Sequence, residues 1–477
     1  MRDYEFYYTL DGSIGLFSHN DNDVYHSKFG AVSEAWEKFI LPSNISKLIN
    51  KKEEIKVLDL CYGIGYNTKT LMSCAINQNK KFLKKEKFIN KFIKKIKKIF
   101  KNNDDKKKCI ESIDTNKIKL KNEILSESID SIQNDIVSKF YIDCLDINEE
   151  LLKISPLLKT VITPQEIFYR TVPEIFSCFK LYWRIKNIFN KFLLKFSPKN
   201  KKEIEDLLNI KFGNNYNELT KEYRIHDFVN YIIIDNLIEK YNRDYFDINI
   251  RKILKEKKFR PFFAKSLLRY AEFKQDFRYK IIRRLNLSTN LHNIYYDHLS
   301  NRYKKAKFNL AKGLFKLNFY VDDARKSILL LNNKYDLIFL DAFTYSKAPE
   351  LWTVEFIAEL YKRLAATGII MTYSNSALVR NTFLENKFYV GKIFNEKTGK
   401  VIGTIATKDK SLIEYPLTNY EIGLCNTKAG IPYHDPNLSL PKEIILKNRE
   451  AEFKSSKLMT SSQYARLRSY KKGEYYE

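Results

Sequence analysis

A short glycine-containing segment carries the first chemical signal in this sequence. It reads Val57-Leu58-Asp59-Leu60-Cys61-Tyr62-Gly63-Ile64-Gly65, an apolar run that ends in a tight turn. Gly63 and Gly65 let backbone N–H groups approach a ligand closely where a helix begins, because a Cβ at either position would hold the ligand away. Any tight strand-to-helix turn can use such glycines, so the segment alone leaves a purely structural turn open.

Two acidic residues further along the chain favour a bound adenosine. Asp146 ends the strand-like run 141–146, where a carboxylate can accept both ribose hydroxyls. Asp323 follows the next strand-like run, in a position to read an adenine amino group. Either one, taken singly, can also be a solvated loop carboxylate. The run Gly63-Ile64-Gly65-Tyr66-Asn67 lacks the third glycine of GxGxxG, which favours S-adenosylmethionine over a nicotinamide cofactor.

A fourth segment, residues 340–352, supplies a candidate catalytic group. Its sequence is LDAFTYSKAPELW, and Asp341 stands at the carboxyl end of an apolar strand, where open α/β sheets bind their ligands. Methyl transfer to an amine chiefly requires an oriented neutral amine. A carboxylate can hold that amine and stabilise the positive charge that develops on nitrogen. Asp341 is therefore the catalytic candidate, with a helix N-cap or a loop salt bridge as the alternative.

Periodicity predicts the elements that position these residues. Strand-like runs occur at 55–60, 141–146, 317–321, 335–340 and 368–373, and helical spacing occurs at 31–40, 67–74 and 355–364. This alternation predicts an α/β, Rossmann-like sheet with large helical insertions. The predicted domain covers residues 1–435, interrupted by a Lys-rich insertion at about 76–138 and a helical insertion at about 155–315. A charged tail follows at 436–477.

The charge of the chain has two interpretations. With 84 Lys and Arg against 57 Asp and Glu, the formal net charge is +27. Such a surplus is typical of proteins that bind nucleic acid phosphates. A genome that favours Lys, Asn and Ile codons would also produce it. Residues 80–108 contain 14 lysines and read as a basic amphipathic helix. This helix suits RNA, a membrane surface or simple docking on the domain.

Other features of the composition exclude several classes of protein. A hydrophobic content of 44% excludes a mainly disordered chain. The six cysteines form no CxxC pair, so no zinc or other metal site is expected, and reduced thiols indicate a cytoplasmic protein. The first residues lack the apolar run of a signal peptide, and no stretch approaches the length of a membrane span. We expect no membrane partner.

Residues 340–352 resemble the signature of the MnmC-type tRNA methyltransferases, whose usual form is close to LD(A/G)FxPxKNPELW. Four other segments resemble that family in the same order: residues 11–13 (DGS), 25–34 (YHSKFGAVSE), 372–380 (TYSNSALVR) and 430–438 (GIPYHDPNL). The resemblance covers roughly residues 5–75, 138–155 and 315–450. Tyr345 stands where the family has proline and Ala348 where it has asparagine, so the loop that meets the substrate departs from the usual pattern.

The resemblance implies an S-adenosylmethionine-dependent N-methyltransferase. Its substrate would be the 5-aminomethyl group of the wobble uridine (position 34) of tRNA, and its product 5-methylaminomethyl-(2-thio)uridine. Asp341 would face the aminomethyl nitrogen. The residues implied to hold S-adenosylmethionine are Gly63, Gly65, Asn67, Asp146 and Asp323. Those implied to lie near the base or the RNA backbone are Lys347, Trp352, Tyr373 and Arg380.

Bifunctional members of this family also carry an FAD-dependent oxidase domain. No second glycine-rich dinucleotide turn occurs in the sequence, so we expect the methyltransferase domain only. Upstream tRNA-modifying enzymes would then supply the aminomethyl-uridine. Two kinds of alternative remain open: an aminopropyltransferase or small-amine N-methyltransferase on the same fold, and a catalytically silent RNA-binding protein.

Overall fold

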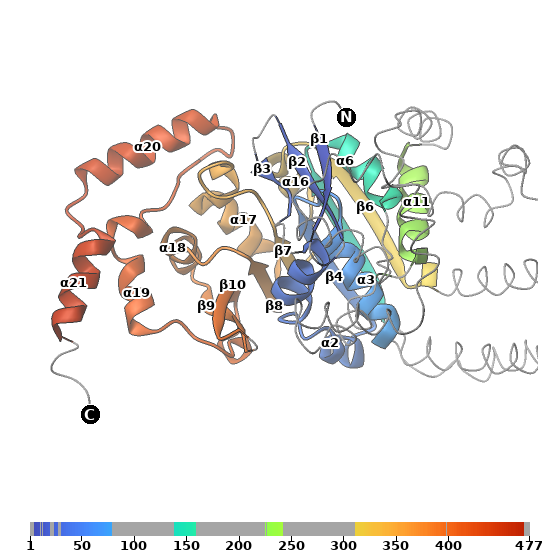
Figure 1. Cartoon of the computed structure of the whole chain (residues 1–477), viewed down its shortest axis with the longest axis horizontal. Helices are drawn as coiled ribbons and strands as arrows, with labels where there is room; N and C mark the ends of the chain where they lie inside the picture. Colours follow the sequence, from blue (N-terminus) through green and yellow to red (C-terminus); the bar gives the residue numbers. More distant parts are fainter. Residues whose placement is uncertain are drawn as a thin grey trace, which may run out of the picture.

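A seven-stranded mixed sheet forms the centre of the molecule (Figure 1). The computed structural model describes residues 4–9, 11, 13–19, 23–26, 30–78, 138–158, 225, 227–241, 311–396 and 398–471. In spatial order the strands are β6 (Phe315–Val321), β5 (Lys139–Asp146), β4 (Glu54–Leu60), β7 (Tyr335–Leu340), β8 (Leu364–Thr372), β10 (Lys400–Thr407) and β9 (Tyr389–Asn395). The first five run parallel, and β10 is antiparallel to both of its neighbours.

Strand β7 shows why the centre of the sheet reads as a continuous apolar run. All six of its residues are buried, as expected for a parallel strand covered on both faces. Leu337 and Phe339 pack into the apolar cluster on one face of the sheet, whereas Ile338 and Leu340 pack into the cluster on the other. Because side chains alternate along a strand, the same strand anchors both clusters.

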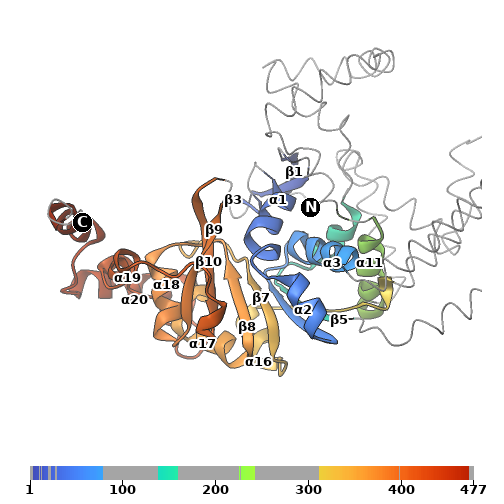
Figure 2. The same cartoon turned by 90° about the horizontal axis from the view of Figure 1, so that it is seen from below.

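Helices cover both faces of this sheet (Figure 2). One face is covered by α1 (Ala31–Ala35), its π-helical continuation η1 (Trp36–Ile40), α2 (Ile45–Lys51), α3 (Tyr66–Gln78), α6 (Glu149–Ile154), the short η2 (Ser155–Leu157) and α11 (Asp227–Tyr241). The opposite face is covered by α16 (Ala324–Leu330), the short η4 (Pro349–Trp352), α17 (Val354–Arg363), α18 (Ala377–Glu385) and α20 (Lys442–Ser455). Two further helices, α19 (Asn419–Cys425) and α21 (Ser461–Lys471), pack against each other through the stacked rings of Tyr420 and Tyr464.

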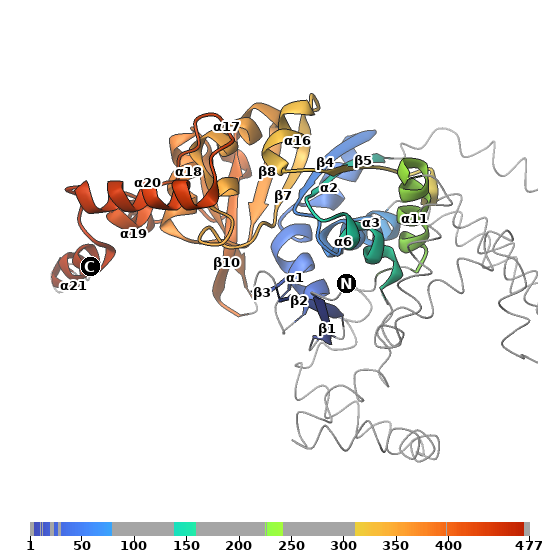
Figure 3. The ribbon, with the colours of Figure 1, turned by 90° about the horizontal axis from the view of Figure 1, so that it is seen from above.

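A small antiparallel sheet lies beside α1 and consists of β1 (Tyr4–Tyr8), β2 (Ile14–Ser18) and β3 (Asp23–Val24) (Figure 3). The Tyr66 hydroxyl of α3 accepts a hydrogen bond of 2.9 Å from the Ile14 backbone N–H. Asp23 pairs with Lys347 at 2.9 Å, in the loop that follows β7. The small sheet is therefore fastened to the end of the large sheet where the parallel strands terminate.

This architecture confirms the predicted α/β, Rossmann-like sheet. The helix predicted at 31–40 is present, but its second half is a π-helix. The predicted charged tail contains two helices, α20 and α21 (Figure 1). No helix in the described part of the chain combines the length and hydropathy needed to cross a bilayer.

Both predicted insertions fall largely outside the described residues. The lysine-rich helix expected at 80–108 lies entirely outside them, and the limits of the insertions stay predictions. For the first insertion, the structure does describe the two residues that flank the undescribed segment. Gln78 ends α3, which runs back from the glycine turn, and Ser138 precedes β5, where its hydroxyl donates to the carbonyl groups of Ile49 and Lys52. Both anchors therefore lie at the amino-terminal edge of the sheet, opposite Asp341.

Candidate active site

The carboxyl ends of three neighbouring strands bring the predicted site residues together. Because β5, β4 and β7 are parallel, their ends meet at one edge of the sheet. Asp146 is the last residue of β5, and Asp341 directly follows β7. The Asp341 N–H donates to the Leu60 carbonyl at 3.4 Å, which joins the loop after β7 to the end of β4. Asp146, Asp341 and the glycine turn thus share one edge.

The turn after β4 requires its glycines. Gly63 has φ +55° and Gly65 has φ +76°, in the left-handed region that side chains disfavour. A Cβ on Gly65 would stand 2.3 Å from the ring of Tyr62 and 2.8 Å from the Ser155 hydroxyl. The Gly63 N–H donates to Asp146 Oδ2 at 2.6 Å, so the turn and the predicted ribose-binding carboxylate are directly connected.

A buried lysine on α3 holds the glycine turn through hydrogen bonds to backbone carbonyl groups. Lys69 on α3 is fully buried, and its amine donates to the carbonyl groups of Ile64 at 2.9 Å and Ser155 at 2.6 Å. Burial lowers the pKa of Lys69 to about 7, because desolvation disfavours its charged form. The side chain thereby ties the glycine turn to η2.

Two buried oxygens at this edge lack a hydrogen-bond donor. Asp59 Oδ2 accepts the Thr68 hydroxyl at 2.6 Å, but Asp59 Oδ1 has no partner among the described residues. Asn67 donates through Nδ2 to Asp341 Oδ2 at 2.8 Å, while Asn67 Oδ1 is likewise without a partner there. Buried acceptors without donors are costly unless a ligand supplies them. S-adenosylmethionine carries ammonium, hydroxyl and amino donors, so the residues at this edge fit that group.

Desolvation is the main cause of the pKa shifts of Asp341 and Asp146. Burial raises the pKa of Asp341 to about 7, and the neighbouring Glu34 carboxylate adds to the rise, whereas the Asn67 hydrogen bond and Lys38 oppose it. Burial raises the pKa of Asp146 to about 6, against hydrogen bonds from the backbone N–H groups of Asn148 and Gly63. Asp341 therefore changes its charge near neutral pH, in the range where a group can exchange protons with an amine.

Tyr373 lies beside Asp341, and Lys347 lies in the loop that follows it. The Tyr373 hydroxyl donates to the Ala342 carbonyl at 2.9 Å, and burial together with the Asp341 charge raises the pKa of Tyr373. Lys347, in the loop after β7, pairs with Asp23 of the small sheet. Both residues are partly exposed.

Trp352 and Arg380 lie in other surroundings. Trp352 is only 1% exposed, and its indole N–H donates to the Phe343 carbonyl at 2.9 Å, so it supports the loop after β7 from within the core. Arg380 is 5% exposed and pairs with Glu421 at 3.0 Å. In this arrangement neither side chain is open to an RNA base, because surrounding groups cover both.

Asp323 has a structural role at the start of a helix. It caps α16, accepting the Arg325 backbone N–H at 2.9 Å, and it pairs with the Arg325 guanidinium at 2.7 Å. Burial opposes the charge, but the hydrogen bonds and charge of Arg325 hold the pKa of Asp323 below its usual value. The adenine contact expected of Asp323 stays a prediction.

Three further residues at this edge were not identified as site residues from the sequence. Asp59 lies inside the glycine-turn segment, six residues before Gly65, so its place in that segment was the available signal. Glu34 lies at the end of residues 25–34, a segment that resembles the MnmC-type opening. Lys38 follows one helical turn later and lies over the Tyr373 ring, 5.4 Å from its centroid. Only the fold shows that these side chains meet Asp341.

One family of known proteins matches the part of the chain that carries Asp323 and Asp341. Residues 286–408 match a family described as S-adenosyl-L-methionine-dependent methyltransferases. We call residues 286–408 the methyltransferase segment. The methyltransferase segment contains β6, β7 and β8 with the loops that carry Asp323 and Asp341, and the match confirms S-adenosylmethionine as the expected cofactor.

Similar curated proteins agree with the methyltransferase segment. Over 106 residues the chain is 28% identical to the tRNA 5-methylaminomethyl-2-thiouridine biosynthesis bifunctional protein MnmC of Pseudomonas putida, covering 21% of this chain and 16% of that protein. Over 161 residues it is 32% identical to an uncharacterized protein of Methanocaldococcus jannaschii, covering 33% of this chain and 45% of that protein. The resemblance to MnmC-type methyltransferases is confirmed, and the chain spans less than half the length of these relatives.

One solved structure, MNMC2 from Aquifex aeolicus, aligns with 95% of this chain and 86% of its own. Its sequence identity is 17% and the TM-score is 0.45.

Replacing Asp59 with asparagine should stabilise the protein more at pH 8 than at pH 5. Burial raises the pKa of Asp59 to about 7, so its stabilising contribution is lost as the pH rises from about 4 to about 7. The asparagine side chain does not ionise, and the gain in free energy of unfolding should be about 2–3 kcal/mol larger at pH 8. Urea denaturation of both proteins at the two pH values measures this difference. An equal effect at both would show that Asp59 is not perturbed.

Proposed function

We propose that this protein transfers a methyl group from S-adenosylmethionine to the 5-aminomethyl group of the wobble uridine of tRNA. The observation that carries the proposal is the bond between Asn67, on the helix that follows the glycine turn, and Asp341 after β7. It couples the end of the cofactor-binding turn to a carboxylate suited to an amine. The product would be 5-methylaminomethyl-(2-thio)uridine.

Five residues are proposed to hold S-adenosylmethionine, which supplies an activated methyl group on a sulfonium. Gly63 and Gly65 would let the backbone approach the cofactor, and Asp146 would accept the ribose hydroxyls. Asn67 would offer Oδ1, which has no partner among the described residues, to a donor of the cofactor. Asp323 would meet the adenine amino group from the N-terminus of α16.

Asp341 is proposed to hold the acceptor amine. A carboxylate whose pKa is raised to about 7 can take a proton from an ammonium group and remain hydrogen-bonded to the neutral amine. It then faces the positive charge that develops when nitrogen gains the methyl group. Asn67 leaves Asp341 Oδ1 for this purpose because its amide occupies Oδ2.

The remaining predicted substrate residues would shape the approach of the tRNA. Tyr373 and Lys347 are both partly exposed, so they would be able to meet a base or a phosphate. Trp352 would act through the loop that it supports at Phe343, and Arg380 would act through α18. The formal charge of +27 suits a polyanionic substrate. A cytoplasmic location and upstream enzymes that make the aminomethyl group complete the proposal.

Methyl incorporation tests this function directly. Purified protein would be incubated with labelled S-adenosylmethionine and with tRNA that bears or lacks the aminomethyl group. We expect label in the first tRNA only, on uridine 34, as located by nucleoside analysis. Label in a small amine but in neither tRNA would contradict the proposed substrate, and binding of tRNA without any transfer would indicate a silent RNA-binding protein.

A further inference from the structure

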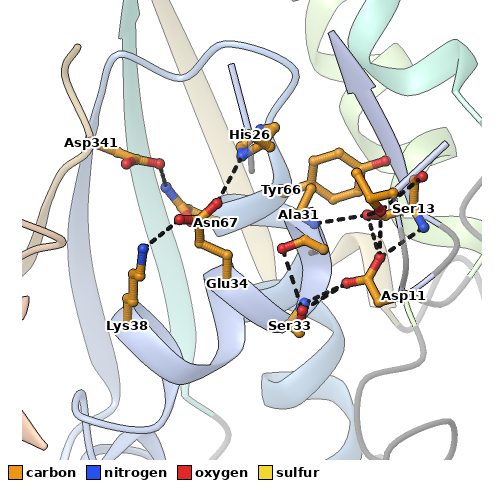
Figure 4. A network of polar contacts seen from close by, with 12 residues as sticks. Asp11, Ser13, His26, Ala31, Ser33, Glu34, Lys38, Tyr66, Asn67 and Asp341 are labelled. Carbon is orange, nitrogen blue, oxygen red and sulfur yellow. Dashed lines mark hydrogen bonds and ion pairs between the residues drawn. The ribbon is translucent and has the colours of Figure 1, made fainter. Parts of the chain in front are cut away.

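Glu34 points from α1 toward the edge of the sheet that carries Asp341. Figure 4 shows its carboxylate between His26 and Lys38, with Asn67 and Asp341 next to it. One of its oxygens pairs with Lys38, and the other lies 3.9 Å from His26 Nδ1. The side chain is 20% exposed, so it is not sealed inside the core.

The helix that carries Glu34 is firmly held. Asp11 accepts the Ser33 backbone N–H at 2.8 Å, and the Ser13 hydroxyl accepts the Ala31 backbone N–H at 2.8 Å, as Figure 4 shows. These bonds satisfy two of the donors that a helix leaves open at its start. Glu34 is therefore fixed in place by the loop between β1 and β2.

Lys38 is the cation that compensates Glu34. His26 stands nearby, but burial lowers its pKa to about 4, so it is neutral at physiological pH. Lys38 lies between Glu34 and Tyr373, since its amine pairs with Glu34 and lies over the Tyr373 ring. Among the described residues, the other titratable groups around this edge include Tyr7 on β1, Asp11 in the loop after it, Asp23 on β3, Asp59 on β4, Cys61 directly after β4, Lys69 on α3, Asp146 on β5 and Tyr373 directly after β8.

We propose that Glu34 is the second carboxylate of the acceptor site, which together with Asp341 binds the protonated aminomethyl group and prepares it for methylation. The inference rests on the proposed function. A lone carboxylate neutralises one charge, whereas Glu34 adds a second negative charge beside Asp341, which favours an ammonium ion. Such a site favours binding of the charged amine and still leaves one carboxylate free to take its proton.

The step balances without another reactant. The ammonium gives one proton to Asp341, and its nitrogen keeps the electron pair. That nitrogen forms a bond to the methyl carbon while the carbon–sulfur bond breaks, and the sulfonium leaves as a neutral thioether. The product is a secondary ammonium ion, and the proton held by Asp341 passes to solvent.

Two variants that change the charge near Asp341 in opposite directions test the pairing of Glu34 with Asp341. Glu34→Gln removes a negative charge near Asp341 and should move the acid limb of the rate–pH profile down by about one pH unit. Lys38→Met removes a positive charge and should move the same limb up. Single-turnover methyl transfer to aminomethyl-tRNA, measured over a range from mildly acidic to mildly basic pH with saturating S-adenosylmethionine, gives both profiles. Glu34→Gln should also raise the tRNA concentration at half-maximal rate about tenfold, as loss of a charge partner requires.

The controls separate a local charge effect from damage to the fold. Glu37→Gln changes a carboxylate on the π-helical continuation of the same segment and should leave the profile in place. Glu34→Asp keeps the charge and should retain the wild-type limb. Calorimetric binding of S-adenosylmethionine reports whether each variant is folded, and if Glu34→Gln does not fold, the upward displacement in Lys38→Met decides the question.

The outcomes are distinguishable. Opposite displacements in the two variants support the carboxylate pair. Profiles that coincide with wild type overturn the role of Glu34 while leaving the proposed function intact. Absence of methyl transfer by the wild-type protein at every pH overturns the proposed function and, with it, this inference.

Discussion

Asp341→Asn should reduce methyl transfer by about 10²–10⁴-fold while binding of S-adenosylmethionine changes little. Asparagine keeps the size of the side chain and can still accept the Asn67 amide through its oxygen. It cannot take a proton from an ammonium ion, and it stabilises the developing charge on nitrogen less well. Single-turnover rates and calorimetric titration of the cofactor measure the two quantities separately.

Asp322→Asn is the matched control for this variant. Asp322 is an exposed carboxylate in the loop after β6, and its removal should leave both quantities near wild type. A turnover close to wild type in Asp341→Asn would remove Asp341 from the mechanism. A loss of cofactor affinity as large as the loss in rate would instead assign Asp341 to the cofactor.

Gly65→Ala should lower the free energy of unfolding by about 2–4 kcal/mol and weaken binding of S-adenosylmethionine at least about tenfold. The new Cβ would have a disfavoured backbone angle of φ +76° and would also stand 2.3 Å from the Tyr62 ring. Relief of this clash must displace Tyr62 or the turn, and the turn carries the N–H group that bonds to Asp146. Urea denaturation and cofactor titration measure the two effects.

Gly399→Ala isolates the backbone contribution. Gly399 has a similar angle, φ +66°, but an added Cβ would meet no atom within 4 Å. Its replacement should cost about 1 kcal/mol, as expected for backbone strain alone, and leave cofactor binding unchanged. Equal losses of stability in the two variants would show that Tyr62 yields freely and that the turn tolerates a side chain.

The parallel part of the fold follows from the sequence because its strands are buried on both faces. The apolar runs ending at Leu60, Asp146 and Leu340 have this signature, and each lies where it was predicted. Strands β9 and β10 lack this signature of a strand that is buried on both faces. They contain Gly391 and Gly403 in their interiors, where an added Cβ would meet neighbouring atoms, and glycine weakens the sequence signal of a strand.

The site is predictable only where strand ends define it. Gly63, Asp146 and Asp341 meet because the carboxyl ends of parallel strands meet. Glu34 comes from a helix more than 300 residues before Asp341, and local periodicity contains no information about that contact. Residue type does not report burial either, so Trp352 reads as a possible surface for a base although surrounding groups cover it.

The position of Gln78 and Ser138 has a consequence for how this chain can change over evolutionary time. Both anchors lie at the edge of the sheet that is remote from the chemistry, and the entropy of closing a segment between fixed anchors rises by only about 0.6 kcal/mol for each doubling of its length. A change in the number of residues between these two anchors therefore has a small closure cost. Such changes need not disturb the opposite edge, which carries Asp341.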